Sequence, residues 1–216
     1  MTGVGAEFSA GTQPDSAPLR GGLRLHRGAR PLIACALAAF ASLTWAAGDA
    51  DIFVHVKKEG PEVVVEVDCP VRASVPTVWD VLTDYDNMAR FISNLQYSAV
   101  QARVDNLLKV RQTGKATRGP LSFTFDNVRE VELRPYTEVR SRLISGDLKA
   151  SSFTTRIVEV DGLVHIINSG RYTPKVWVPP LIGPALIEEE TRKQFGEIRN
   201  EILRRGERRA AELVPR

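Results

Sequence analysis

Apolar residues recur at helical spacing through the last long segment of the chain, from Val178 to Arg205. Charged residues occupy its other side, including the i,i+4 pair Glu188 and Arg192. On a helical wheel, one arc of about 100° collects Pro184, Ile187, Thr191, Gln194, Phe195, Ile198 and Ile202. Gly183 followed by Pro184 suits a helix start, because proline fits the first turn. The pattern predicts a helix of roughly 20 residues, about 30 Å long, whose apolar side needs an equally long surface to cover it.

Alternation of apolar and polar positions predicts strands through the middle of the chain. Val63, Val65 and Val67 face away from Val64, Glu66 and Asp68 and give a first strand. Further strands are expected near 95–104, 107–116, 121–132, 137–145, 150–160 and 163–173. Their turn signals, such as Asp161-Gly162, are short enough to join antiparallel neighbours.

Two short helices are expected between the first and second of these strands. Ser74 and Pro76 are start signals for a helix that ends near Asp84, and Asp86 or Asn87 can cap the next one. With the long helix at the end, the order is β-α-α-β6-α, an α+β chain with about seven strands in one antiparallel sheet. A single long helix covers one sheet face efficiently, so one side of each strand should be apolar.

The first short helix and the residues after it resemble a known protein family. The stretch VPTVWDVLTDY from Val75 to Tyr85, followed by Met88, Phe91, Ile92 and Leu95, resembles the opening of the START-like (SRPBCC) superfamily. The polyketide cyclase/dehydrase-like proteins and the coenzyme-Q-binding START subgroup are the most similar members. The likeness covers about 61–205, and it is more specific for fold than for function. It implies a helix-grip fold, in which a curved antiparallel sheet holds the long C-terminal helix with an apolar cavity between them.

The resemblance implies a set of cavity-lining positions. They are Phe91, Leu95, Val110, Gln112, Phe123, Phe125, Leu143, Ile166, Asn168, Ile187, Thr191, Phe195 and Ile198. Ordinary core packing explains any one of them as well as ligand contact does. Gln112, Asn168 and Thr191 are the sharper candidates, because an unpaired polar group in an apolar interior costs ~1–3 kcal/mol. Water or another protein group could equally supply the partner.

An uncharged loop lies just before the long helix and includes Trp177, Pro180 and Leu181. Exposed apolar loops commonly contact something. We expect these residues to form the cavity mouth and to touch a membrane transiently during ligand exchange. Packing against the short helices is the alternative.

The N-terminal part has the order of a secretory signal. Arg20, Arg24, Arg27 and Arg30 precede an uncharged run over 31–48 that ends in small residues. A retained anchor and an organelle transit peptide are the alternatives. The expected division is a basic leader with a signal peptide over 1–50, a linker over 51–60, the START-like domain over 61–206 and a flexible tail over 207–216. Localisation would then be secreted or periplasmic.

Motifs for enzymatic or metal chemistry are missing from the sequence. His55 and His165 have no second ligand at metal spacing, and no phosphate loop, nucleophile elbow or HExxH pattern occurs. Signal removal would leave Cys69 as the sole cysteine, so no internal disulfide could form, and an inert buried thiol is expected there. The strand residues Arg129, Arg140, Arg142 and Arg156 are interpreted as sheet exterior. No cofactor or metal is expected.

The expected function is therefore non-enzymatic binding, and carriage, of a hydrophobic small molecule such as a lipid, a quinone or a polyketide-like compound. An aromatase/cyclase-type enzyme and an exported interaction module without ligand are the alternatives. A net charge of +3 with interspersed signs argues against nucleic-acid binding. The protein is expected to act as a monomer.

Overall fold

The computed structural model describes residues 51–118, 121–175 and 183–212, with side chains left out at 116–118 and 121–123. One order of elements runs through it: β1 (Phe53–Glu59), β2 (Glu62–Val71), α1 (Val75–Leu82), the 3-10 helix η1 (Tyr85–Arg90), β3 (Leu95–Val104), β4 (Leu107–Arg118), β5 (Leu121–Arg134), β6 (Glu138–Gly146), β7 (Leu148–Val160), β8 (Leu163–Pro174) and α2 (Gly183–Glu212).

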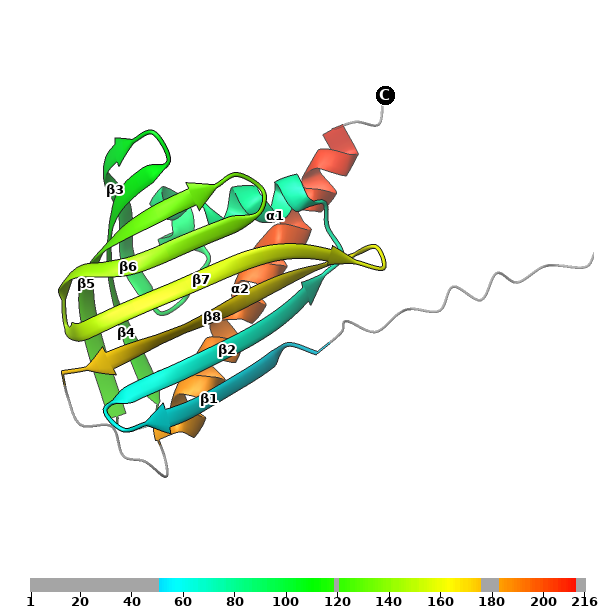
Figure 1. The fold of residues 1–216 in the computed structure, drawn as a ribbon. Helices are drawn as coiled ribbons and strands as arrows, with labels where there is room; N and C mark the ends of the chain where they lie inside the picture. Colours follow the sequence, from blue (N-terminus) through cyan, green and yellow to red (C-terminus); the bar gives the residue numbers. More distant parts are fainter. Residues whose placement is uncertain (1–50, 119–120, 176–182, 213–216) are drawn as a thin grey trace, which may run out of the picture. The chain divides into compact units, whose positions relative to one another are not determined.

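The strands form a single antiparallel sheet in the order β1-β2-β8-β7-β6-β5-β4-β3. Strands β3 to β8 follow one another as the predicted meander, and β8 returns to pair with β2. The sheet bends strongly, so that β3–β5 run across the direction of β1, β2 and β8, and α2 crosses its concave side (Figure 1). This is the helix-grip α+β fold, with eight strands among the described residues instead of the expected seven.

The extra strand, β1, lies where a linker was expected over 51–60. Val54 and Val56 are buried and pair with Val67 and Val65 of β2 across a hairpin turned at Gly60, whose φ is +58°. The linker interpretation was wrong because the apolar alternation stops at Val56 and charged residues follow. Charges at the end of an edge strand are an ordinary protection against unwanted pairing.

Helix α2 is longer than its apolar stripe. It has 30 residues and reaches Glu212, so the first six residues of the expected tail over 207–216 are helical. The Arg209 guanidinium donates to Thr77 Oγ1, at 3.1 Å, and forms an ion pair with Asp80, both on α1. The helix continues past the stripe because ion pairs to α1 replace apolar contacts.

The middle of α2, from Phe195 to Ile202, is packed more tightly than the turns before it that carry Ile187 and Thr191. Phe195, Ile198 and Ile202 are buried against β1, β2 and α1, whereas Ile187 and Thr191 remain half-buried. Cys69 of β2 is fully buried beside the Phe195 carbonyl, as expected for an inert thiol. Local capping supports this packing, since Ser74 Oγ accepts a hydrogen bond from the Thr77 amide at the start of α1.

Candidate functional site on the inner face of the sheet

Strand register defines the face of the sheet that carries the buried valines of β2, here called the inner face. Val65 lies opposite Gly170, Gly170 opposite Phe153, and Phe153 opposite Ser141. Ser141 in turn lies opposite Val131 of β5. Side chains at directly paired positions point to the same side of a sheet, so these residues all share the inner face.

Burial along the inner face is uneven. Val63, Leu108, Val110 and Ile166 are almost fully buried. The inner-face residues Phe125, Leu143, Phe153, Tyr172 and, from α2, Ile187 and Thr191 are only half-buried. These half-buried side chains give the inner face along β5–β8 an apolar surface that remains partly accessible.

Two of the three predicted polar cavity residues already have protein partners. Gln112 Nε2 donates to Ser98 Oγ at 3.0 Å, and Asn168 Oδ1 accepts from Thr155 Oγ1 at 3.0 Å. Both residues are buried. A hydrogen bond within the protein therefore accounts for the buried amide of each residue, without a ligand. Thr191 is half-buried on α2.

The predicted apolar lining residues separate into two groups. Leu95, Val110, Ile166, Phe195 and Ile198 are buried in the core. Phe125, Leu143 and Ile187 are half-buried, and the Phe91 ring lies 5.7 Å from the guanidinium carbon of Arg205. The Phe123 side chain and all of Trp177, Pro180 and Leu181 lie outside the described residues, so the lining and the mouth stay predictions.

Arg129 was interpreted as sheet exterior, and this was wrong. It lies directly opposite Val110 on β4 and Leu143 on β6, both inner-face residues. The signal was present in the sequence, because Arg129 has the same parity as Phe125 and Val131 on its own strand. By contrast, the exterior interpretation holds for Arg142, whose Nε lies 2.7 Å from Glu130 Oε1 on the solvent side.

The Arg129 side chain is half-buried and forms no ion pair with any described residue. Its Nε is shut off from solvent and has no hydrogen-bond acceptor among the described residues. Burial lowers the pKa of Arg129 below its ordinary value, yet arginine stays protonated at any physiological pH.

Two further hydrogen-bond donors lie near Arg129. Tyr85 of η1 is buried; burial raises its pKa to about 12, and the positive charge of Arg129 opposes that rise. Ser141 is the diagonal neighbour of Arg129 on the inner face, and its buried hydroxyl has no hydrogen-bond partner among the described residues. We call Arg129, Tyr85 and Ser141 the donor cluster. At neutral pH every member can donate a hydrogen bond to an oxygen acceptor.

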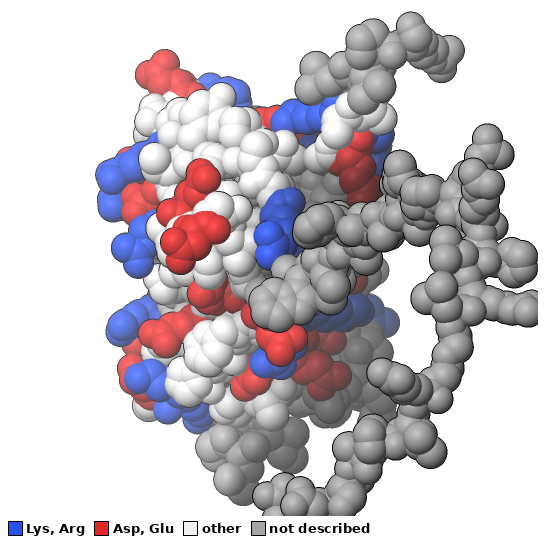
Figure 2. All heavy atoms as spheres, turned by 90° about the vertical axis from the view of Figure 1, so that its right-hand side faces the viewer, with Lys and Arg blue, Asp and Glu red and all other residues white. Residues whose placement is uncertain are grey.

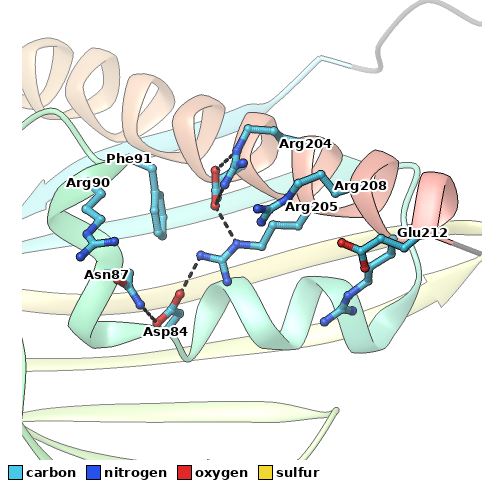
Figure 3. Close-up of a pocket in the computed structure, with 10 residues that line it drawn as sticks. Asp84, Asn87, Arg90, Phe91, Arg204, Arg205, Arg208 and Glu212 are labelled. Carbon is cyan, nitrogen blue, oxygen red and sulfur yellow. Dashed lines mark hydrogen bonds and ion pairs between the residues drawn. The ribbon is translucent and has the colours of Figure 1, made fainter.

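A second concave feature lies on the surface between α2 and the two short helices (Figure 3). This arginine groove is lined by Asp84, Asn87, Arg90, Phe91, Glu201, Arg204, Arg205, Arg208, Arg209 and Glu212. Arg205 bridges its two sides, because its Nη2 lies 2.7 Å from Asp84 Oδ2 and its Nε lies 2.6 Å from Glu201 Oε1. The Asp84 carboxylate also accepts from Asn87 Nδ2 at 2.7 Å. The ion pairs give the groove a structural role in holding α2 to α1 and η1.

Glu201 is the buried carboxylate of this groove, and its charge should stabilise the fold. The hydrogen bond from Arg204 lowers the pKa of Glu201 to about 2 against the opposing effect of burial, and Arg205 adds to the lowering. Because the folded-state pKa lies below the unfolded one, the stabilisation is present above about pH 4.5 and is lost as the pH falls toward 2. We expect Glu201→Gln to lower the free energy of unfolding by about 2 kcal/mol at pH 7.

Urea unfolding at a series of pH values checks this expectation. The difference between wild type and Glu201→Gln should shrink as the pH is lowered from 5 to about 3. The control is Glu130→Gln, whose exposed ion pair with Arg142 should contribute less than about 1 kcal/mol. A Glu201 difference that stayed constant with pH would contradict the argument.

Some kinds of site are not found in the described ranges. No group of three or more His, Cys, Asp or Glu side chains over 51–118, 121–175 and 183–212 is placed to hold a metal ion. Within the same ranges, no helix has the length and apolar character needed to cross a membrane. On the face shown in Figure 2, acidic and basic side chains are interspersed rather than gathered by sign.

Comparison with known proteins assigns the class and then the family. An eight-stranded bent sheet holding one long helix, with half-buried side chains on its inner face, defines a START-like helix-grip protein. The family described as "Polyketide cyclase / dehydrase and lipid transport" matches residues 71–194, more than half of the chain. The chain belongs to this family. The finer resemblance to a coenzyme-Q-binding subgroup has no specific support from these matches.

Solved structures agree with the fold. A STAR-related lipid transfer protein from Xanthomonas axonopodis has a TM-score of 0.60 at 13% identity, covering 71% of this chain and 94% of its own. The Zhui aromatase/cyclase from a Streptomyces species has a TM-score of 0.55 at 16% identity, covering 69% and 96%. A START superfamily protein from Mycobacterium smegmatis has a TM-score of 0.55 at 14% sequence identity, and the match covers 65% of this chain and 97% of its own. No curated protein matches in sequence. At such identities the likeness establishes the fold alone.

Proposed function

We propose that this protein binds, and carries, a hydrophobic small molecule such as a lipid, a quinone or a polyketide-like compound between the sheet and α2. Family membership implies a hydrophobic ligand. The observation that carries the proposal is the half-buried inner face around Phe125, Leu143 and Phe153, opposite the loosely packed start of α2. Apolar side chains that keep accessible surface on the inside gain stability when an apolar ligand covers them.

The donor cluster supports binding more than catalysis. A general base works best with a pKa near the operating pH, but burial raises the pKa of Tyr85 to about 12 and Arg129 also keeps its proton. Both groups therefore act as hydrogen-bond donors at neutral pH. An aromatase/cyclase-type enzyme is the second candidate, favoured by the proximity of these two titratable groups to one another.

We also propose that the ligand is met outside the cytoplasm. The support is the basic segment and the uncharged run over 31–48 that ends in small residues, as in a secretory signal. The membrane contact of the loop around Trp177 belongs to the same proposal, because ligand exchange with a bilayer needs an apolar approach surface.

Native mass spectrometry of protein from its natural host, followed by solvent extraction, tests these points together. We expect one hydrophobic molecule per protein chain and an intact mass showing loss of the N-terminal segment. Thr191→Trp should reduce ligand occupancy several-fold by filling interior space, whereas Asn200→Trp on the exposed side of the same helix should not.

A ligand-free protein that also binds no apolar fluorescent probe would contradict the binding proposal. Conversion of an added poly-β-ketone to a cyclised product would instead favour the enzyme. In that case, Tyr85→Phe should lower the rate of conversion.

A further inference from the structure

The donor cluster has a composition that narrows the ligand's chemistry. Arg129, Tyr85 and Ser141 all offer hydrogens, and the described contacts give Arg129 no acceptor. The acidic residues on its own strand, Glu130 and Glu132, point to the opposite face, where they pair with Arg142 and Arg134. The interior at this point is thus rich in donors and lacks a negative charge.

Resting on the proposed function, we infer that the ligand carries a carboxylate, and that Arg129 binds this head group while the apolar remainder lies along the inner face. An arginine guanidinium has a planar fork of donors that matches the two oxygens of a carboxylate. Arg129 brings one positive charge, and a carboxylate returns one negative charge, so the buried site becomes neutral.

The surroundings of Arg129 fit a ligand that is polar at one end only. Its direct cross-strand neighbours, Val110 and Leu143, are apolar. Phe153 and Tyr172 stack farther along the inner face, with ring centroids 6.4 Å apart. A chain that starts at the guanidinium would therefore pass over apolar and aromatic side chains. The hydroxyls of Tyr85 and Ser141 can donate to the same head group from η1 and β6.

A structural role for Arg129 is the competing explanation. Structural buried arginines have carboxylates or carbonyls as partners, as Arg205 has in Asp84 and Glu201. Arg129 has none among the described residues. A cationic side chain on the inner face, whose buried Nε has no acceptor among the described residues, can take an acceptor from a ligand.

The test uses a matched pair of fluorescent probes, dansylaminoundecanoic acid and its methyl ester, which share chain and fluorophore and differ in charge. We expect the full-length protein, delipidated, to bind the acid about tenfold or more tightly than the ester, as charge-assisted hydrogen bonds allow. Arg129→Met should remove this preference, because it should weaken binding of the acid far more than binding of the ester. Arg129→Lys, which keeps the charge and loses the fork, should keep part of the preference.

Arg142→Met is the control, because this arginine lies on the outer face in an exposed ion pair and should keep the preference of wild type. Equal affinity of wild type for acid and ester would overturn the inference and leave the proposed function standing. A preference for the acid that persists in Arg129→Met would also overturn the inference and leave the proposed function standing. Failure of both probes to bind would count against the proposed function itself, and the inference would fall with it.

Discussion

Arg129→Met should make the ligand-free protein more stable. The substitution removes a partly buried charge that has no partner among the described residues and places an apolar side chain of similar length beside Val110 and Leu143. We expect a gain of about 2 kcal/mol, which corresponds to a rise in Tm of ~4–8 °C for a domain of this size. Differential scanning calorimetry of delipidated protein measures it.

The control for this prediction is Arg142→Met on the solvent side of the sheet. Its ion pair with Glu130 is exposed, so its removal should change the Tm by less than ~2 °C. A fall in Tm for Arg129→Met would mean that the guanidinium stabilises the fold, and the donor cluster would then be part of the core. A gain in stability with a loss of carboxylate binding is the pattern of a residue kept for function.

Ile202→Ala should give the largest loss of stability of the substitutions considered. Ile202 is fully buried in the tightly packed middle of α2, within the cluster formed with β1, β2 and α1. Truncation of a buried isoleucine to alanine costs ~2–5 kcal/mol, because the removed methyl groups leave a cavity. The midpoint of urea unfolding should fall while the m-value stays constant.

Asn200→Ala tests whether the helix itself, rather than its packing, is responsible. Asn200 is exposed on the same turn of α2, and alanine is the better helix former. We expect this variant to be as stable as wild type or slightly more stable. If Ile202→Ala cost less than about 1 kcal/mol, α2 would not be anchored through its middle, from Phe195 to Ile202.

Periodicity was enough to predict most of this fold. The stripe through Phe195, Ile198 and Ile202 and the valine alternation of β2 both follow from apolar spacing, and the structure buries these residues. Where charges interrupt the alternation, as after Val56 in β1, the pattern loses its signal although the backbone continues in the sheet. The extension of α2 to Glu212 depends on contacts with α1, which sequence spacing does not show.

The candidate site was harder to predict because its key residue has the wrong chemistry for its position. Strand parity places Arg129 on the same side as Phe125 and Val131, but arginine is so commonly exposed that composition outweighed parity. The inward positions of Gln112 and Asn168 were predicted correctly, because uncharged amide side chains are buried more readily than charged ones. Their protein partners, Ser98 and Thr155, come from the neighbouring strands β3 and β7, and only strand register reveals them.

The hairpin of β1 and β2 has a practical consequence for anyone shortening this chain. A truncation at Pro61, where alternation alone would start the domain, deletes β1 and leaves the amides and carbonyls of β2 unpaired along one side. The valine-rich edge of β2 would then be open to edge-to-edge pairing with another chain. The truncation would also remove Val54 and Val56 from the core against which α2 packs, so the open edge and the weakened core would both favour aggregation.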